Sequence, residues 1–264
     1  MKTSQPALVA LAASICCSAI PALAQEQAPR RNQELQTVNS SEKVRVNALA
    51  MINALANRNS SPKLVGRHHT PVFGKKYDWS EYTRVWGKAI PEIVDHVGDA
   101  WSELVKHIDD ERYCITLGND SGSFNWTVGV VCRRIVASNL TEACYQAVKT
   151  ESKGDYARLC PEVVLDNTKL KSWCVNRVDK RLYQMQIEMC GLAIAQVSKA
   201  DEDSPSPQTR RAWGAALEAE IRSLRESKRA VRFNGFGSEE FDLYSAEKAE
   251  KLREELNSDG NQSK

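Results

Sequence analysis

The chain is built around residues 114–190, which read CITLGNDSGSFNWTVGVVCRRIVASNLTEACYQAVKTESKGDYARLCPEVVLDNTKLKSWCVNRVDKRLYQMQIEMC. Six cysteines are spread almost evenly over this stretch, about one per helix-length segment: Cys114, Cys132, Cys144, Cys160, Cys174 and Cys190. Cysteines that bind a metal usually come in closely spaced pairs, and no CxxC or CxC pair is present here. The spacing therefore favours disulfides that join packed helices, although it does not select which cysteines pair.

The first 24 residues have the pattern of a secretory signal peptide. A basic start at Met1-Lys2 is followed by an apolar run over 7–13 and by Ala22-Leu23-Ala24, after which we predict cleavage. The apolar run is shorter than the roughly 20 residues that span a bilayer, and we expect no transmembrane segment in the mature chain. Export to the periplasm or the extracellular space is where cysteines persist as disulfides, which strengthens that interpretation.

The overall charge gives no reason to expect nucleic acid as a partner, because the formal net charge is only +2. Two local segments are nevertheless strongly uneven. Arginine and lysine dominate residues 210–232, whereas aspartate and glutamate dominate residues 239–259. We expect these segments to form two helices that face each other with complementary charge.

Apolar residues recur every three or four positions through most of the chain, which indicates amphipathic helices. We predict an all-α fold: a multi-helix, disulfide-stapled domain with amphipathic helical appendages at both ends. The predicted segments are a flexible linker (25–40), an N-terminal helix and loop (41–77), the disulfide-stapled helical core (78–199) and charged C-terminal helices with a disordered tail (205–264).

Within the core, local signals predict where individual helices begin and end. Asp78 is an N-cap candidate, and 113–117 is a short extended piece before a turn rich in glycine and asparagine. Helix is expected to resume at Phe124 or Asn125, and a new helix is expected to begin at Asn139 or Thr141. A long helix is predicted from Asn167 to about Lys199.

One group of side chains has spacing suitable for a metal site. Glu92 and His96 are four residues apart, as are Glu103 and His107, and the two pairs are separated by three helical turns. On one continuous helix these side chains would share a face with Asp99, and a second helix could complete a divalent-metal site. A solvated face is the simpler interpretation, since carboxylate–imidazole pairs are common on exposed helices.

The tryptophans raise a second alternative, a cavity for a hydrophobic ligand. Six are present, each on the apolar side of a predicted helix or beside a cysteine: Trp79, Trp86, Trp101, Trp126, Trp173 and Trp213. Core packing accounts for such positions equally well.

No motif for a nucleotide, a haem, a catalytic serine or a zinc protease is present. The function that we predict is therefore an exported interaction or structural module that binds a protein partner in the periplasm, the envelope or the extracellular space. The alternatives are a carrier of a hydrophobic ligand and a periplasmic enzyme or metal protein that uses Glu92, His96, Glu103 and His107. We assign no catalytic residue, cofactor or metal.

Overall fold

A computed structural model describes residues 47–152, 159–199, 205–236 and 241–262. The predicted signal peptide and linker lie outside these ranges, as does the end of the predicted tail. The helices are α2 (Ala48–Leu55), α3 (Trp79–Arg84), α4 (Ile90–Asp95), α5 (Val97–Lys106), α6 (Val128–Ser152), α7 (Glu162–Leu165), α8 (Asn167–Val175), α9 (Leu182–Ser198), α10 (Pro207–Ser227) and α11 (Ala246–Gln262), with a π-helical turn η1 (Val85–Ala89) between α3 and α4.

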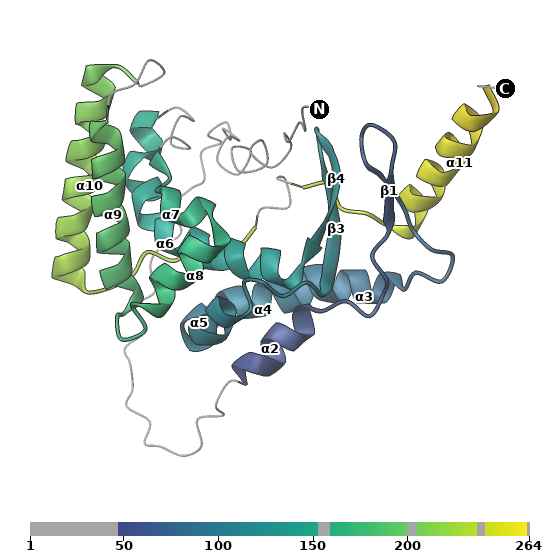
Figure 1. The fold of residues 1–264 in the computed structure, drawn as a ribbon, viewed down its shortest axis with the longest axis horizontal. Helices are drawn as coiled ribbons and strands as arrows, with labels where there is room; N and C mark the ends of the chain where they lie inside the picture. Colours follow the sequence, from purple (N-terminus) through teal and green to yellow (C-terminus); the bar gives the residue numbers. More distant parts are fainter. Residues whose placement is uncertain (1–46, 153–158, 200–204, 237–240, 263–264) are drawn as a thin grey trace, which may run out of the picture.

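The elements are arranged along the long axis of the molecule (Figure 1). Helices α6, α9 and α10 pack on one another at one end. Helices α3 to α5 run along the base, with α2 packed against α5. A β-hairpin stands on this base, and α11 lies at the end opposite to α10 (Figure 1).

The prediction of an all-α fold is wrong, because the mostly helical chain also contains two small antiparallel sheets. Strand β1 (Lys63–Val65) pairs with β2 (Thr70–Val72), and β3 (Tyr113–Asn119) pairs with β4 (Gly122–Thr127). The extended piece predicted at 113–117 is part of β3. This strand is buried on both faces, so it lacks the alternation of polar and apolar residues that marks a half-exposed strand.

The predicted disulfides are also absent, since no two cysteines in the described residues lie at the distance of a disulfide bond. The Sγ atoms of Cys144 and Cys190 are 3.3 Å apart, well beyond the roughly 2.0 Å of a disulfide bond. Five of the six are buried, and Cys160 is half-buried. The buried cysteines thus serve as small apolar side chains of the core, a common use of cysteine, and two of them, Cys132 and Cys144, lie on the same helix α6.

Three helix boundaries differ from the prediction. The helix expected from Phe124 or Asn125 begins only at Val128, because 122–127 form β4. The expected helix at 167–199 is divided into α8 and α9 by a turn over 176–181. The expected break at Asn139 does not occur, because the Asn139 amide donates to the Ile135 carbonyl oxygen within the continuous α6, at 2.9 Å. By contrast, the predicted cap at Asp78 is confirmed: its carboxylate accepts from the Ser80 backbone N–H at 2.9 Å.

The chain between α10 and α11 crosses the molecule in an extended path that we call the strap, described over 229–236 and 241–244 (Figure 1). Its first half is held by Gln186, a fully buried side chain of α9. The Gln186 amide group donates to the Val231 carbonyl oxygen at 2.6 Å and accepts from the Val231 N–H at 3.0 Å. It also donates to the Asn139 carbonyl oxygen at 2.7 Å, and the Asn139 side chain accepts from the Phe233 N–H at 3.4 Å.

The second half of the strap pairs with the hairpin. Gly118 and Asp242 exchange two backbone hydrogen bonds, of 2.9 and 2.8 Å. A Cβ atom at Gly118 would lie 2.8 Å from the Tyr244 hydroxyl, so the close approach requires glycine. The Tyr244 N–H donates to the Tyr82 hydroxyl at 3.1 Å, which ties the strap to α3.

We predict that Gln186→Leu lowers the free energy of unfolding by about 1–3 kcal/mol, because it leaves the buried C=O of Asn139 and the partly buried N–H and C=O of Val231 without these partners. Urea denaturation followed by circular dichroism measures the change. Gln196→Leu on the exposed side of the same helix is the matched control and should change the midpoint little. Equal effects of the two substitutions would show that the strap does not depend on Gln186.

We predict that the buried thiols resist alkylation at pH 8 in the native protein. Burial excludes the reagent and raises the pKa of Cys132 and of Cys174 to about 12, which keeps both thiols protonated. Cys160 should react first because it is half-buried. After denaturation without reductant, mass spectrometry should find all six cysteines of 114–190 alkylated. A smaller number would contradict the free-thiol structure.

Candidate interaction surface

The four residues considered for a metal site do not converge. Helix α4 ends at Asp95, and His96 has non-helical angles (φ −105°, ψ 23°) before α5 begins, so the continuous helix on which that expectation rested is interrupted. The His96 ring lies 3.7 Å from the Asp99 carboxylate. Glu103 lies 3.9 Å from the His107 ring, as its spacing predicts, but its closer partner is Lys106 at 2.6 Å. Among the described residues no three side chains of the metal-binding types come together.

The tryptophans are distributed over several parts of the structure rather than lining one cavity, although Trp86 and Trp126 both contact Phe241. Trp79 packs among Phe73, Tyr77 and Tyr82 near α3, whereas Trp126 packs against Phe241 of the strap. Trp213 is buried in α10. These rings therefore stabilise different parts of the core, and Trp173 stands apart from them on α8.

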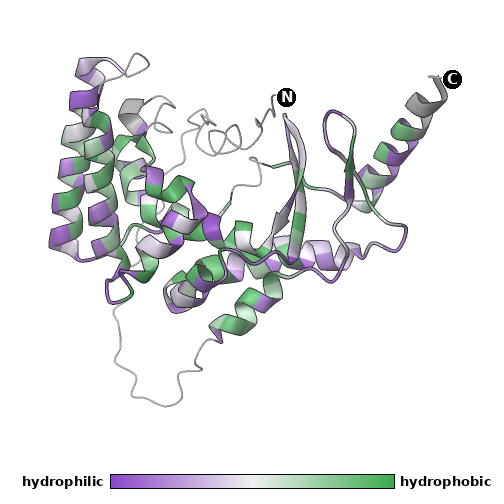
Figure 2. Ribbon diagram, in the orientation of Figure 1, coloured by the Kyte–Doolittle hydropathy of each residue, from purple (hydrophilic) through white to green (hydrophobic). Residues whose placement is uncertain are grey.

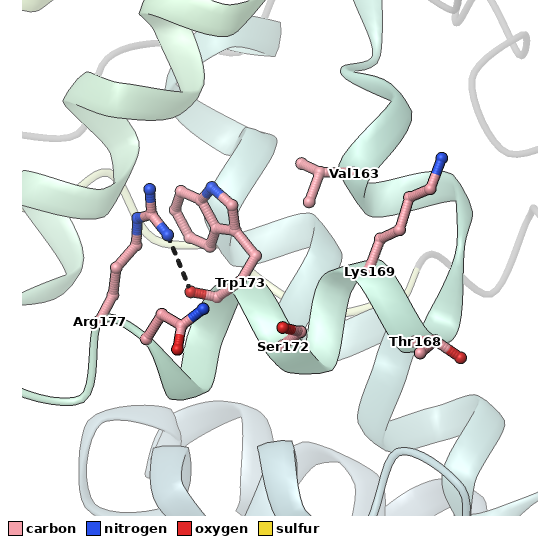
Figure 3. A pocket seen from close by; sticks show the side chains of 7 residues that line it. Val163, Thr168, Lys169, Ser172, Trp173 and Arg177 are labelled. Carbon is pink, nitrogen blue, oxygen red and sulfur yellow. Dashed lines mark hydrogen bonds between the residues drawn. The ribbon is translucent and has the colours of Figure 1, made fainter.

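The surface around α7 and α8 combines a hollow with an ordered aromatic side chain (Figure 3). Asp166, between the two short helices, begins α8 by accepting from the Lys169 backbone N–H at 2.8 Å. The resulting turn places α7 beside α8 and leaves a shallow, open hollow of about 470 Å³ between them. Its lining residues are Val163, Thr168, Lys169, Ser172, Trp173, Asn176 and Arg177.

Trp173 forms one wall of the hollow and is held by Arg177. The Arg177 guanidinium carbon lies 4.0 Å from the centre of the Trp173 ring, a cation–π contact (Figure 3). The same guanidinium donates to the Trp173 carbonyl oxygen at 3.1 Å and to the Glu188 carboxylate of α9 at 2.6 Å. Because three contacts fix Arg177, the indole wall is already ordered in the unbound chain.

Glu188 forms ion pairs with both Arg177 and Lys180. Burial raises the pKa of its carboxyl, but hydrogen bonds from Lys180 and Arg177 outweigh burial and leave the pKa below its ordinary value. Glu188 is therefore ionised at neutral pH, and its charge is shared between two cations. On the opposite rim Lys169 pairs with the exposed Glu162. The charges around the hollow thus have partners, and the remaining polar groups are neutral: Thr168, Ser172 and Asn176.

Large exposed apolar side chains also occur on this part of the chain. Six are exposed in the described residues, and three of them lie on 165–178: Leu165 at 45%, Val175 at 57% and Val178 at 73%. None of these three lines the hollow, and single exposed aliphatic residues are ordinary on a protein surface. The sequence signal for the contact between Arg177 and Trp173 is their four-residue spacing. The apolar periodicity of the segment instead predicts Trp173 in the core.

The two charged C-terminal helices do not face each other as expected. Helix α10 packs on α9 and α6, whereas α11 packs on β2 through its edge at Ala249 and Leu252. They lie at opposite ends of the described structure (Figure 1), and hydrophilic residues line both of them (Figure 2). The charged face of each helix is therefore open to solvent.

No protein-family model, curated protein or solved structure matches this chain. In the described part of the chain, no helix has the length and apolar character needed to span a bilayer. The functional argument therefore depends on the surfaces of the molecule itself.

Proposed function

We propose that this chain is an exported interaction module that binds a protein partner through the α7–α8 surface. The observation that carries the proposal is the half-buried Trp173, fixed by Arg177 in the wall of an open hollow. Tryptophan and arginine are the residues most enriched among those that dominate binding energy at protein interfaces. A side chain that is ordered before binding also loses less conformational entropy when a partner arrives.

The chemistry of the hollow indicates what the partner presents. Trp173 and Val163 offer apolar contact, and the neutral hydroxyl and amide groups around them can donate and accept hydrogen bonds. Because Arg177, Glu188 and Lys169 already have partners of opposite charge, a strongly charged ligand gains little here. The surface suits an apolar side chain flanked by backbone polar groups, as on an exposed loop or helix of a protein rather than on a nucleic acid.

The location that we propose is the periplasm, the envelope or the extracellular space. It is supported by the signal-peptide pattern of residues 1–24 alone, since the cysteines no longer contribute to the argument. Buried, protonated thiols react slowly with oxidants, so free cysteines are compatible with export. The carrier and metal-dependent alternatives draw no comparable support from the described tryptophans and histidines.

Site-specific photo-cross-linking in the cells that make the protein tests the proposal. A photoreactive amino acid at Ser172, on the rim of the hollow, should give a discrete adduct with another protein. The same amino acid at Gln196, exposed near the other end of α9, should not. Trp173→Ala should reduce the adduct at Ser172 about tenfold or more, the effect of losing a dominant interface residue.

Two controls separate loss of binding from loss of folding. Circular dichroism should show that Trp173→Ala keeps its helices, and Trp173→Phe should retain most of the adduct because an aromatic wall remains. An adduct that forms equally at Gln196, or that is insensitive to Trp173→Ala, would remove the α7–α8 surface from the function. The export part is tested separately: the mature protein should begin at Gln25 and lie outside the cytoplasm.

A further inference from the structure

We propose that copies of this chain associate head to tail, with the acidic face of α11 of one copy docked on the basic end of α10 of the next. The basic end of α10 consists of five exposed side chains at the last turns of the helix and the start of the strap: Arg222, Arg225, Lys228, Arg229 and Arg232. Within the described residues none of these side chains is engaged in an ion pair. Glu226 is the one exposed acid between them.

Helix α11 presents the opposite charge. Ala249 faces β2, and on an ideal helix the residues pointing away from it are Glu247, Lys251, Glu254 and Glu255. All four are exposed, and three of them are acids. Glu250 lies at the side of the helix and pairs with Arg253. The cations of this helix lie mostly toward its docked side: Arg253 reaches the Phe73 carbonyl oxygen at 3.5 Å, and Lys248 pairs with Asp242 at 3.6 Å. The outward face of α11 is consequently an acidic strip.

The arrangement of the fold prevents these two surfaces from meeting within one chain. Helix α10 belongs to the three-helix bundle, whereas α11 packs on β2 at the opposite end, and the body of the molecule lies between them (Figure 1). The strap that connects them is held at Val231 and at Asp242. A second copy of the same chain supplies the complementary surface without any rearrangement of the first.

Charge complementarity of this kind determines the character of the association. Exposed ion pairs contribute roughly 0–1 kcal/mol each and are screened by salt, so we expect a weak, salt-sensitive contact. The contact is heterologous, since it joins two different surfaces of each copy. Further copies can therefore add at both ends unless the chain of copies closes into a ring. This association uses other residues than the α7–α8 surface and stands or falls independently of the proposed function.

Sedimentation of the full chain over a range of concentrations tests the proposal. In about 20 mM salt the average mass should rise with protein concentration beyond that of a dimer, and in about 500 mM salt it should return to that of one chain. Neutralising one surface, with R222Q/R225Q/R229Q or with E247Q/E254Q/E255Q, should leave each variant monomeric in low salt. The control K63Q/K88Q/K106Q removes three exposed lysines elsewhere and should associate like the unmodified protein.

Mixing the two neutralised variants gives the decisive result. One variant keeps only the acidic strip and the other only the basic end, so an equimolar mixture should form a complex of two chains and no larger species. Association of either variant alone would refute the head-to-tail contact. The proposal is also refuted if the chain stays monomeric in low salt. Binding of its basic end to phosphatidylglycerol vesicles would then assign that surface to an anionic membrane.

Discussion

The buried amide of Gln186 is the interaction on which the arrangement of the two ends depends. It is a fully buried side chain of α9, and its hydrogen bonds satisfy the carbonyl group of Asn139 on α6 and the partly buried backbone groups of Val231 in the strap. An extended segment without sheet partners needs such a side chain to cross a core. From Val231 the strap runs toward the hairpin, where Gly118 holds it through two backbone hydrogen bonds with Asp242. The position of α11 therefore follows from α9.

Sequence periodicity predicted the parts of the fold that are amphipathic on their own. The helix cap at Asp78 and the helical character of most of the core needed only local signals. The strands could not be predicted in the same way: β3 is buried on both faces, and β4 ends at Thr127, directly before the first residue of α6. Asn139 resembles a helix cap in isolation, yet its side chain serves the strap about 90 residues later in the chain. Only tertiary contacts distinguish these cases.

The cysteines show how one correct observation supported a wrong conclusion. Their spacing is even and five of the six are buried, two of them on α6, but burial as a small apolar residue requires no bond between them. The candidate binding surface was missed for a related reason. A tryptophan on an apolar stripe was assigned to the core, whereas α7 and α8 are too short to cover Trp173. The exposure of Trp173 depends on the turn at 176–181, which the helical periodicity of the sequence does not predict.

The two surfaces of this molecule differ in the physics that would make each of them bind. At α8 the ion pairs are complete and the apolar groups are exposed, so attraction requires close contact and is insensitive to salt. At α10 and α11 the apolar groups are packed and the charges are exposed, so attraction acts over about a Debye length and disappears in salt. The fold thus keeps the apolar α7–α8 surface apart from the charged surfaces of α10 and α11. The strap holds these two helices at opposite ends of the described structure.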